Sequence, residues 1–160
     1  NYMGVTRKVK YTMEAPKNNL QTVKVTKDAD NIYFMVESDA DITENDGSGN
    51  WMNIFMTAGE VQNTGWVCYD YVINRSSENQ TAIIEKLDAD GNGTKVGLAK
   101  ISVQGKYMQL AIPRSAVGLQ DSNTFYFKVA DGVQHPEDIM DYYVTGRSLP
   151  MGRLSFKFVG

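Results

Sequence analysis

Short runs in which apolar and polar residues alternate, separated by turn residues about every ten positions, constrain the fold of this chain more than any other feature. Alternation with a period of two is typical of strands that bury one face and expose the other. Residues 106–113 show it most clearly, because two sets of side chains alternate there: Met108, Leu110 and Ile112 on one face, and Tyr107, Gln109 and Ala111 on the other.

The same pattern recurs along the chain and predicts an all-β protein of about nine or ten strands without a long helix. We expect a two-sheet antiparallel β-sandwich of jelly-roll type, with a closed barrel as the alternative. The expected strands cover residues 5–11, 22–27, 32–38, 51–57, 68–74, 81–86, 96–104, 106–113, 124–130 and 154–159, and residues 113–119 are expected to contain one helical turn.

Length and charge narrow the class of protein. The 160 residues predict a single domain, residues 1–160. The net charge is −3 and the only basic cluster lies at residues 7–10, which argues against a nucleic-acid partner.

No apolar run in the sequence approaches the ~20 residues of a membrane span, so no membrane span is expected. One cysteine, Cys68, excludes an intramolecular disulfide. Because the chain starts at Asn1 without a leader-like segment, we expect a domain excised from a larger protein.

Residues 51–75 bring both tryptophans, Trp51 and Trp66, close to amides and an arginine. Aromatic rings offer flat apolar faces to a sugar, and neighbouring polar side chains offer directional hydrogen bonds. This combination indicates a carbohydrate-binding site. The alternative for both indoles is packing in the core, since tryptophan is highly buried on average.

The polar partners in this segment are Asn53, Asn74 and Arg75. An arginine can donate two parallel hydrogen bonds, which suits a pair of neighbouring hydroxyls. The alternative for Arg75 is an ion pair with Asp70 or Glu85.

Segments spread over residues 31–158 resemble a family 9 carbohydrate-binding module, a DOMON-like β-sandwich domain. The most specific segments are WMNIF and AIPRSAVGL, and the others, in chain order, are NIYFMVES, GWVCYDYVINR, KVGLAKISV, FYFKVADGVQ, DIMDYYVTG and PMGRLSF. The resemblance implies a jelly-roll domain that binds polysaccharide or oligosaccharide without catalysis. It also implies an accessory role in a secreted, periplasmic or cell-surface bacterial protein that degrades polysaccharide, covalently linked to a catalytic domain such as a glycoside hydrolase.

In a module of this kind, two rings would stack on the sugar and four polar side chains would compete for its hydroxyls: Trp66 and Trp51, then Asn53, Asn74, Arg75 and Arg147. Apart from a structural calcium ion, which some relatives carry, the resemblance implies no cofactor. The chain lacks two carboxylate positions common in such modules, one within residues 56–59 and one at residues 146–147.

A candidate calcium loop lies at residues 88–94, where Asp88, Asp90 and Asn92 match the opening D-x-D-G-N-G pattern. The residue at the closing glutamate position is Ala99, so a polar hairpin turn is the alternative. The acidic residues within 39–46 form a second, less specific candidate.

Three other functional classes remain open at this point. One is a structural or interdomain module without ligand, for which both tryptophans would be buried. Another is a glycoside hydrolase domain, which needs two suitably spaced carboxylates. The last is a haem-binding DOMON domain, in which His135 and a methionine would be the axial ligands.

Overall fold

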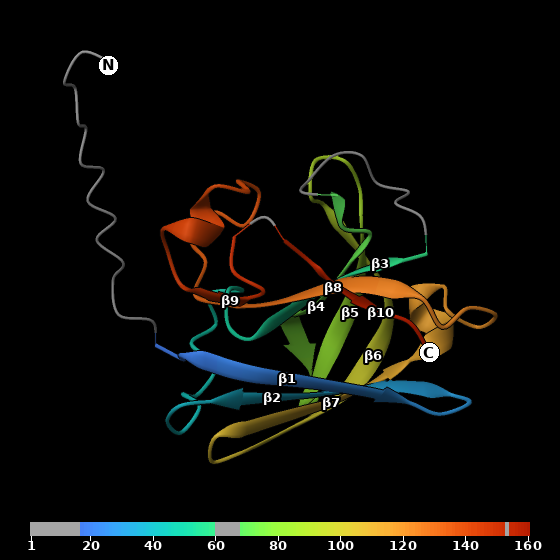
Figure 1. Ribbon diagram of the computed structural model, residues 1–160, viewed down its shortest axis with the longest axis horizontal. Coiled ribbons are helices and arrows are strands. Elements are labelled where there is room, and N and C mark those ends of the chain that lie inside the picture. The colour runs from blue at the N-terminus through green and yellow to red at the C-terminus, as the bar shows by residue number, and fades with distance from the viewer. Residues whose placement is uncertain (1–16, 60–67, 153) are drawn as a thin grey trace, which may run out of the picture.

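The computed structural model describes residues 17–59, 68–152 and 154–160, and within them the protein is all-β (Figure 1). The strands are β1 (Leu20–Lys27), β2 (Asn31–Ser38), β3 (Asn53–Ala58), β4 (Tyr71–Glu78), β5 (Thr81–Leu87), β6 (Gly93–Gln104), β7 (Tyr107–Pro113), β8 (Phe125–Asp131), β9 (Arg147–Leu149) and β10 (Phe156–Phe158). Two helical turns, η2 (Arg114–Val117) and η3 (Asp141–Tyr143), lie in the connections. In this part of the chain, no helix has both the length and the apolar character needed to cross a membrane.

The strands form one antiparallel sheet in the order β1-β2-β7-β6-β5-β4-β3-β8-β10, and β9 pairs separately with β8. The sheet curls into a nearly closed, barrel-like shape (Figure 1). Near the closure, Arg147 Nε on β9 donates a hydrogen bond of 3.2 Å to the carbonyl of Leu20 on β1. The all-β prediction is therefore confirmed, whereas the division into two packed sheets is not confirmed.

The alternating pattern places one face of each central strand in the core. On β2, Ile32, Phe34 and Val36 are buried while the residues between them are partly exposed. Across the interior, the Phe34 ring lies 6.2 Å from that of Phe125 and 5.2 Å from that of Phe127, both on β8. Because β2 and β8 are distant in the strand order, these contacts join opposite halves of the sheet.

Element boundaries depart from the sequence prediction where the backbone is not extended. The strand expected over residues 68–74 begins at Tyr71, and Cys68 before it has φ 63°, a left-handed rather than an extended conformation. The short strand β9 was not predicted. The helical turn expected within residues 113–119 is η2, and it ends at Gly118, whose φ of 68° suits glycine. The strand expected at residues 5–11 lies outside the described residues.

The outer face of β3, β4 and β8 is covered by the chain that follows β8. Tyr142, from this covering segment, packs edge-on against Phe55 of β3 with ring centroids 6.3 Å apart. Tyr69 contributes another ring, 5.5 Å from Phe55. The result is a second, smaller apolar cluster outside the sheet, formed by Phe55, Tyr69, Val72, Leu87, Ala130, Val133 and Tyr142.

Lys128 on β8 is wholly buried beneath this covering segment. Its ammonium donates hydrogen bonds of 2.6 Å to the carbonyls of Pro150 and Gly152 and lies 5.3 Å from the centre of the Tyr142 ring. Burial lowers the pKa of Lys128 to about 8. The buried ammonium thus holds the covering segment to the sheet while its charged form is disfavoured.

The lowered pKa of Lys128 predicts a pH dependence of stability. Between the folded-state pKa of about 8 and the ordinary value of 10.5, the unfolded chain binds more protons, so the unfolding free energy should rise with pH. The slope should be at most about 1.4 kcal/mol per pH unit. Chemical denaturation from about pH 7.5 to about pH 9 measures this, and over that range the tyrosines of the unfolded chain stay about nine-tenths or more protonated.

Lys128→Met should flatten this rise, and Lys86→Met, which replaces an exposed lysine, should preserve it. Parallel pH curves for the wild type and Lys128→Met would show that the ammonium is not the group responsible.

Candidate functional site

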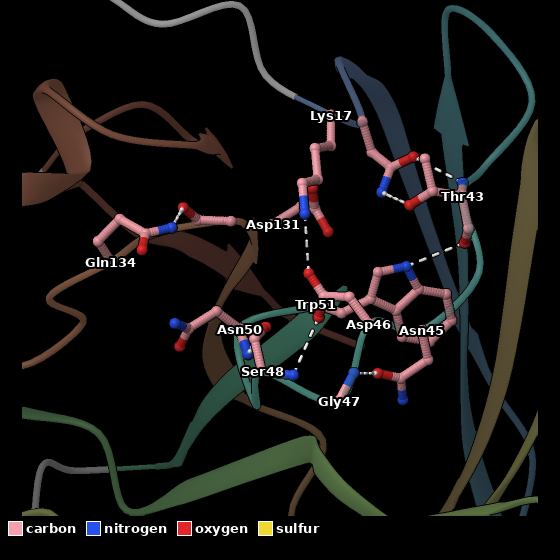
Figure 2. Close-up of polar contacts among 12 residues, drawn as sticks. Lys17, Thr43, Asn45, Asp46, Gly47, Ser48, Asn50, Trp51, Asp131 and Gln134 are labelled. Carbon is pink, nitrogen blue, oxygen red and sulfur yellow. Dashed lines mark hydrogen bonds and ion pairs between the residues drawn. The ribbon is translucent and has the colours of Figure 1, made fainter.

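Trp51, one of the two predicted stacking residues, is a core residue with 8% of its surface exposed. Its indole Nε1 donates a hydrogen bond of 3.0 Å to the carbonyl of Thr43 (Figure 2). The small exposed part of Trp51 lines two polar hollows, one beside Asp46 and one beside Thr43. The indole therefore presents little ring surface on which a sugar could stack.

The hollow beside Asp46 measures about 310 Å³, and its polar groups mainly support the loop that forms it. The Asp46 carboxylate pairs with Lys17 at 3.0 Å and accepts a hydrogen bond from the Ser48 amide, also at 3.0 Å (Figure 2). Asp131, on the other side, is buried and accepts a hydrogen bond of 3.0 Å from the Met52 amide. Burial raises the pKa of Asp131.

The two predicted amide ligands, Asn53 and Asn74, are both buried and hydrogen-bonded to main-chain carbonyls. The Asn53 side chain donates to the Asn74 carbonyl at 3.1 Å. The Asn74 side chain donates to the Met52 carbonyl at 3.1 Å and the Trp51 carbonyl at 3.4 Å. These amides donate hydrogen bonds to backbone carbonyls near the start of β3. Buried carbonyls need such partners.

Asn74 also occupies an irregular position in β4. Its φ is 73°, and the pairing of β4 with β5 shifts register between Ile73 and Ser77. Asparagine tolerates the left-handed conformation better than most residues. Asn74 thus combines a backbone role with a hydrogen-bonding role, and both are structural.

The two predicted arginines are likewise engaged with the protein. Arg75 donates two hydrogen bonds, of 3.1 and 3.0 Å, to the Glu85 carboxylate and a third, of 3.0 Å, to the Gly91 carbonyl. The ion pair with Glu85, one of the alternatives for Arg75, is therefore present. Arg147 bonds the Leu20 carbonyl across the sheet closure.

The candidate calcium loop forms a tight hairpin turn between β5 and β6. Asp88 Oδ1 accepts hydrogen bonds of 2.9 Å from the amides of both Asp90 and Asn92, and Oδ2 accepts the Asn92 side chain at 3.2 Å. These bonds lower the pKa of Asp88, the backbone bond from Asn92 contributing most. The hairpin alternative is thus what the structure shows, and calcium binding by this loop stays a prediction.

The predicted sugar-binding residues do not surround one open site in the described part of the chain. Trp51, Asn53 and Asn74 are buried together, whereas Arg75 and Arg147 bond other strands. Trp66 lies outside the described residues.

A groove of about 660 Å³ lies instead on the outer face of β1, β2, β7 and β6, which no other described segment covers. A second hollow, of about 320 Å³, continues it and shares Met35, Ser102 and Gln109 with it. We call the combined feature the outer groove. The side chains that face it are Lys24, Thr26, Tyr33, Met35, Lys100, Ser102, Gln104, Tyr107, Gln109 and Ala111.

The strand register sets the positions of these side chains. One row across the four strands consists of Lys24, Met35, Gln109 and Ser102. The next row consists of Thr26, Tyr33, Ala111 and Lys100. Tyr107 lies on the same strand as Ala111 and four residues before it, so Tyr107 and Tyr33 are about 13 Å apart along the strands. Two aromatic rings therefore stand at opposite ends of a mainly apolar floor.

The ring of Tyr33 is held in place by its hydroxyl. This hydroxyl donates a hydrogen bond of 2.6 Å to Asp28 in the turn between β1 and β2. The bond is the largest cause of the lowered pKa of Asp28 and raises the pKa of Tyr33. A ring fixed in this way loses little conformational freedom when a ligand packs on it.

The other end of the outer groove is open to solvent, and Tyr107 is 43% exposed there. Among the described residues, the side chains of Ser102, Gln104 and Gln109 have no protein hydrogen-bond partner. An amide offers both donors and acceptors, and a hydroxyl does the same. The outer groove thus combines two rings with polar groups that are free to bind a ligand.

Sequence reasoning identified part of this surface without recognising it as a site. The alternation in residues 106–113 placed Tyr107, Gln109 and Ala111 on the solvent side, and their exposure confirms that assignment. Tyr33 was missed because nothing in the sequence shows that β2 pairs with β7. The sequence signal that could have indicated a site is the outward placement of the Tyr107 ring beside the Gln109 amide on one strand.

Comparisons of the chain with protein-family models, curated proteins and solved structures find no match.

Substitution of Asn74 tests whether the buried amides are structural. Asn74→Ala should lower the unfolding free energy by about 3 kcal/mol, roughly 1 for the left-handed backbone and roughly 1 for each lost hydrogen bond. Denaturant titration followed by circular dichroism measures the change.

Asn79→Ala is the matched control, because Asn79 also has a positive φ, of 49°, but is exposed. It should cost only the backbone contribution, about 1 kcal/mol. Equal losses in the two variants would contradict a structural role for the Asn74 side chain.

Proposed function

We propose that this domain binds carbohydrate without altering it chemically, and that the outer groove is the binding surface. The observation that carries this proposal is the placement of Tyr33 and Tyr107 at opposite ends of the groove, with unpaired amides between and beside them.

Sugars are recognised by two kinds of contact that the outer groove offers. The C–H face of a sugar ring packs on an aromatic ring, and its hydroxyls exchange hydrogen bonds with amide and hydroxyl groups. Met35 and Ala111 give the floor an apolar surface between the rings. A wet site with few stacked rings supports dissociation constants from micromolar to millimolar, about 4–8 kcal/mol of binding free energy.

The residues that face the outer groove support binding rather than hydrolysis. Glycoside hydrolysis requires two carboxyl groups on either side of the scissile bond. Among the described residues that line the groove, none is Asp or Glu. This composition supports the non-catalytic role that we propose.

The proposal extends to the larger protein that would contain this domain. The domain would be an accessory module, related to the family 9 carbohydrate-binding modules, of a secreted bacterial protein that degrades polysaccharide. A linked catalytic domain would act on the polymer that the module holds. A jelly-roll description suits the two halves of the sheet, because β2 and β8 pack on each other across the core. Calcium binding stays a separate prediction.

A structural, interdomain role is the second candidate. Two observations favour it: Trp51 is buried, and apolar side chains are exposed near the C-terminal end of the described chain, namely Met151, Leu154, Phe156 and Val159. A domain that served only this role would show no saturable affinity for saccharides.

Substitution of Tyr107 tests the proposal directly. Tyr107→Ala should weaken oligosaccharide binding about 5- to 30-fold, the equivalent of roughly 1–2 kcal/mol for a stacked ring. Tyr107→Phe keeps the ring and should retain most of the affinity. Isothermal titration calorimetry with cello-, xylo-, manno- and maltohexaose measures both variants against the wild type.

Tyr126→Ala is the control, because Tyr126 lies on β8, outside the outer groove. It should bind as the wild type does. A Tyr107→Ala variant with unchanged affinity for a sugar that the wild type binds would place the site elsewhere.

A further inference from the structure

The outer groove carries positive charge in a protein of negative net charge. Lys24 and Lys100 both line it, while the whole chain has a net charge of −3. Within the described residues, neither lysine forms an ion pair or a hydrogen bond with another side chain. Their ammonium groups are therefore available to a ligand.

The two lysines stand on opposite sides of the groove floor. Lys24 is on β1, beside Met35, and Lys100 is on β6, beside Ala111. Their strands are separated by β2 and β7, so the backbones are about 14 Å apart across the sheet. Each ammonium is attached to a flexible four-carbon stem, and both side chains line the groove.

Among the described residues, a carboxylate flanks the two lysines at each end of the groove. Asp28, next to Tyr33, accepts hydrogen bonds from the amides of Asp30 and Asn31 as well as from the Tyr33 hydroxyl. Glu37 pairs in register with Tyr107 at the opposite end. Lys24 lies in the middle row of the floor and Lys100 in the row of Tyr33, and both lie between the two carboxylates.

We propose, given the proposed function, that the outer groove prefers saccharide chains carrying anionic groups, either carboxylates or sulfates, over neutral chains. The anionic groups of the ligand meet Lys24 and Lys100 over the groove floor. Charge-assisted hydrogen bonds are about twice as strong as neutral ones, which gives the anionic chain its advantage. Because both lysines are exposed, the advantage is modest and is screened by salt.

The test compares matched charged and neutral ligands. One pair is oligogalacturonate and its fully methyl-esterified form, and the other is a sulfated galactan oligosaccharide and its desulfated form. Calorimetric titrations at about 50 mM and about 500 mM NaCl should show the anionic member binding at least about fivefold tighter at low salt, with the difference lost at high salt. The two pairs distinguish carboxylate from sulfate as the preferred group.

Two double variants locate the effect. Lys24→Gln/Lys100→Gln should lose the preference, so that the charged and neutral members of a pair bind with equal affinity. Lys86→Gln/Lys157→Gln, with the same change in net charge outside the outer groove, should keep the preference. An anionic preference that survives in Lys24→Gln/Lys100→Gln would overturn the assignment to these lysines.

The outcomes separate this inference from the function on which it rests. Equal affinity of the wild type for charged and neutral members would overturn the anionic preference and leave carbohydrate binding intact. Failure of the wild type to bind any saccharide of either pair, or any of the neutral hexaoses, would overturn both.

Discussion

The packing of Phe34 against Phe125 and Phe127 across the interior is the contact on which the rest of the structure depends. It joins β2 to β8, two strands that lie far apart in the sheet, and so keeps the sheet curled. A curled sheet has one inner face, and the apolar residue of each alternating pair occupies it. The other residue of each pair then faces outward, where it either meets solvent or is covered by another segment.

The outer face is divided into a covered half and an open half, and this division separates structural from functional residues. Over β3, β4 and β8, the chain after β8 supplies Tyr142, and Lys128 is buried beneath it. Trp51 belongs to the main core inside the sheet. Over β1, β2, β7 and β6, no described segment covers the sheet, and Tyr33, Tyr107 and unpaired amides remain available. We therefore propose the open half as the ligand-binding surface.

The sequence predicts local features of this fold better than it predicts the site. Alternation is a local property, so the buried and exposed faces of β7 were predicted correctly. The alignment of Tyr33 with Ala111 depends on pairing between strands distant in sequence, which alternation does not specify. Asn53 and Asn74 were predicted to bind sugar because a sequence does not distinguish an amide that meets a sugar from one that donates to a backbone carbonyl. Their burial against backbone carbonyls depends on how β3 and β4 pack, which the sequence does not reveal.

The most direct test of the outer groove is a map of backbone amide chemical shifts during titration with the tightest-binding saccharide. We expect the chemical-shift changes to concentrate on β1, β2, β7 and β6, at residues 24–26, 33–35, 100–104 and 107–111. We expect the amide shifts around Trp51 and Asn74 to stay unchanged. Shifts confined to the Trp51 region, with none on these four strands, would contradict the account and return the site to the residues that the sequence first suggested.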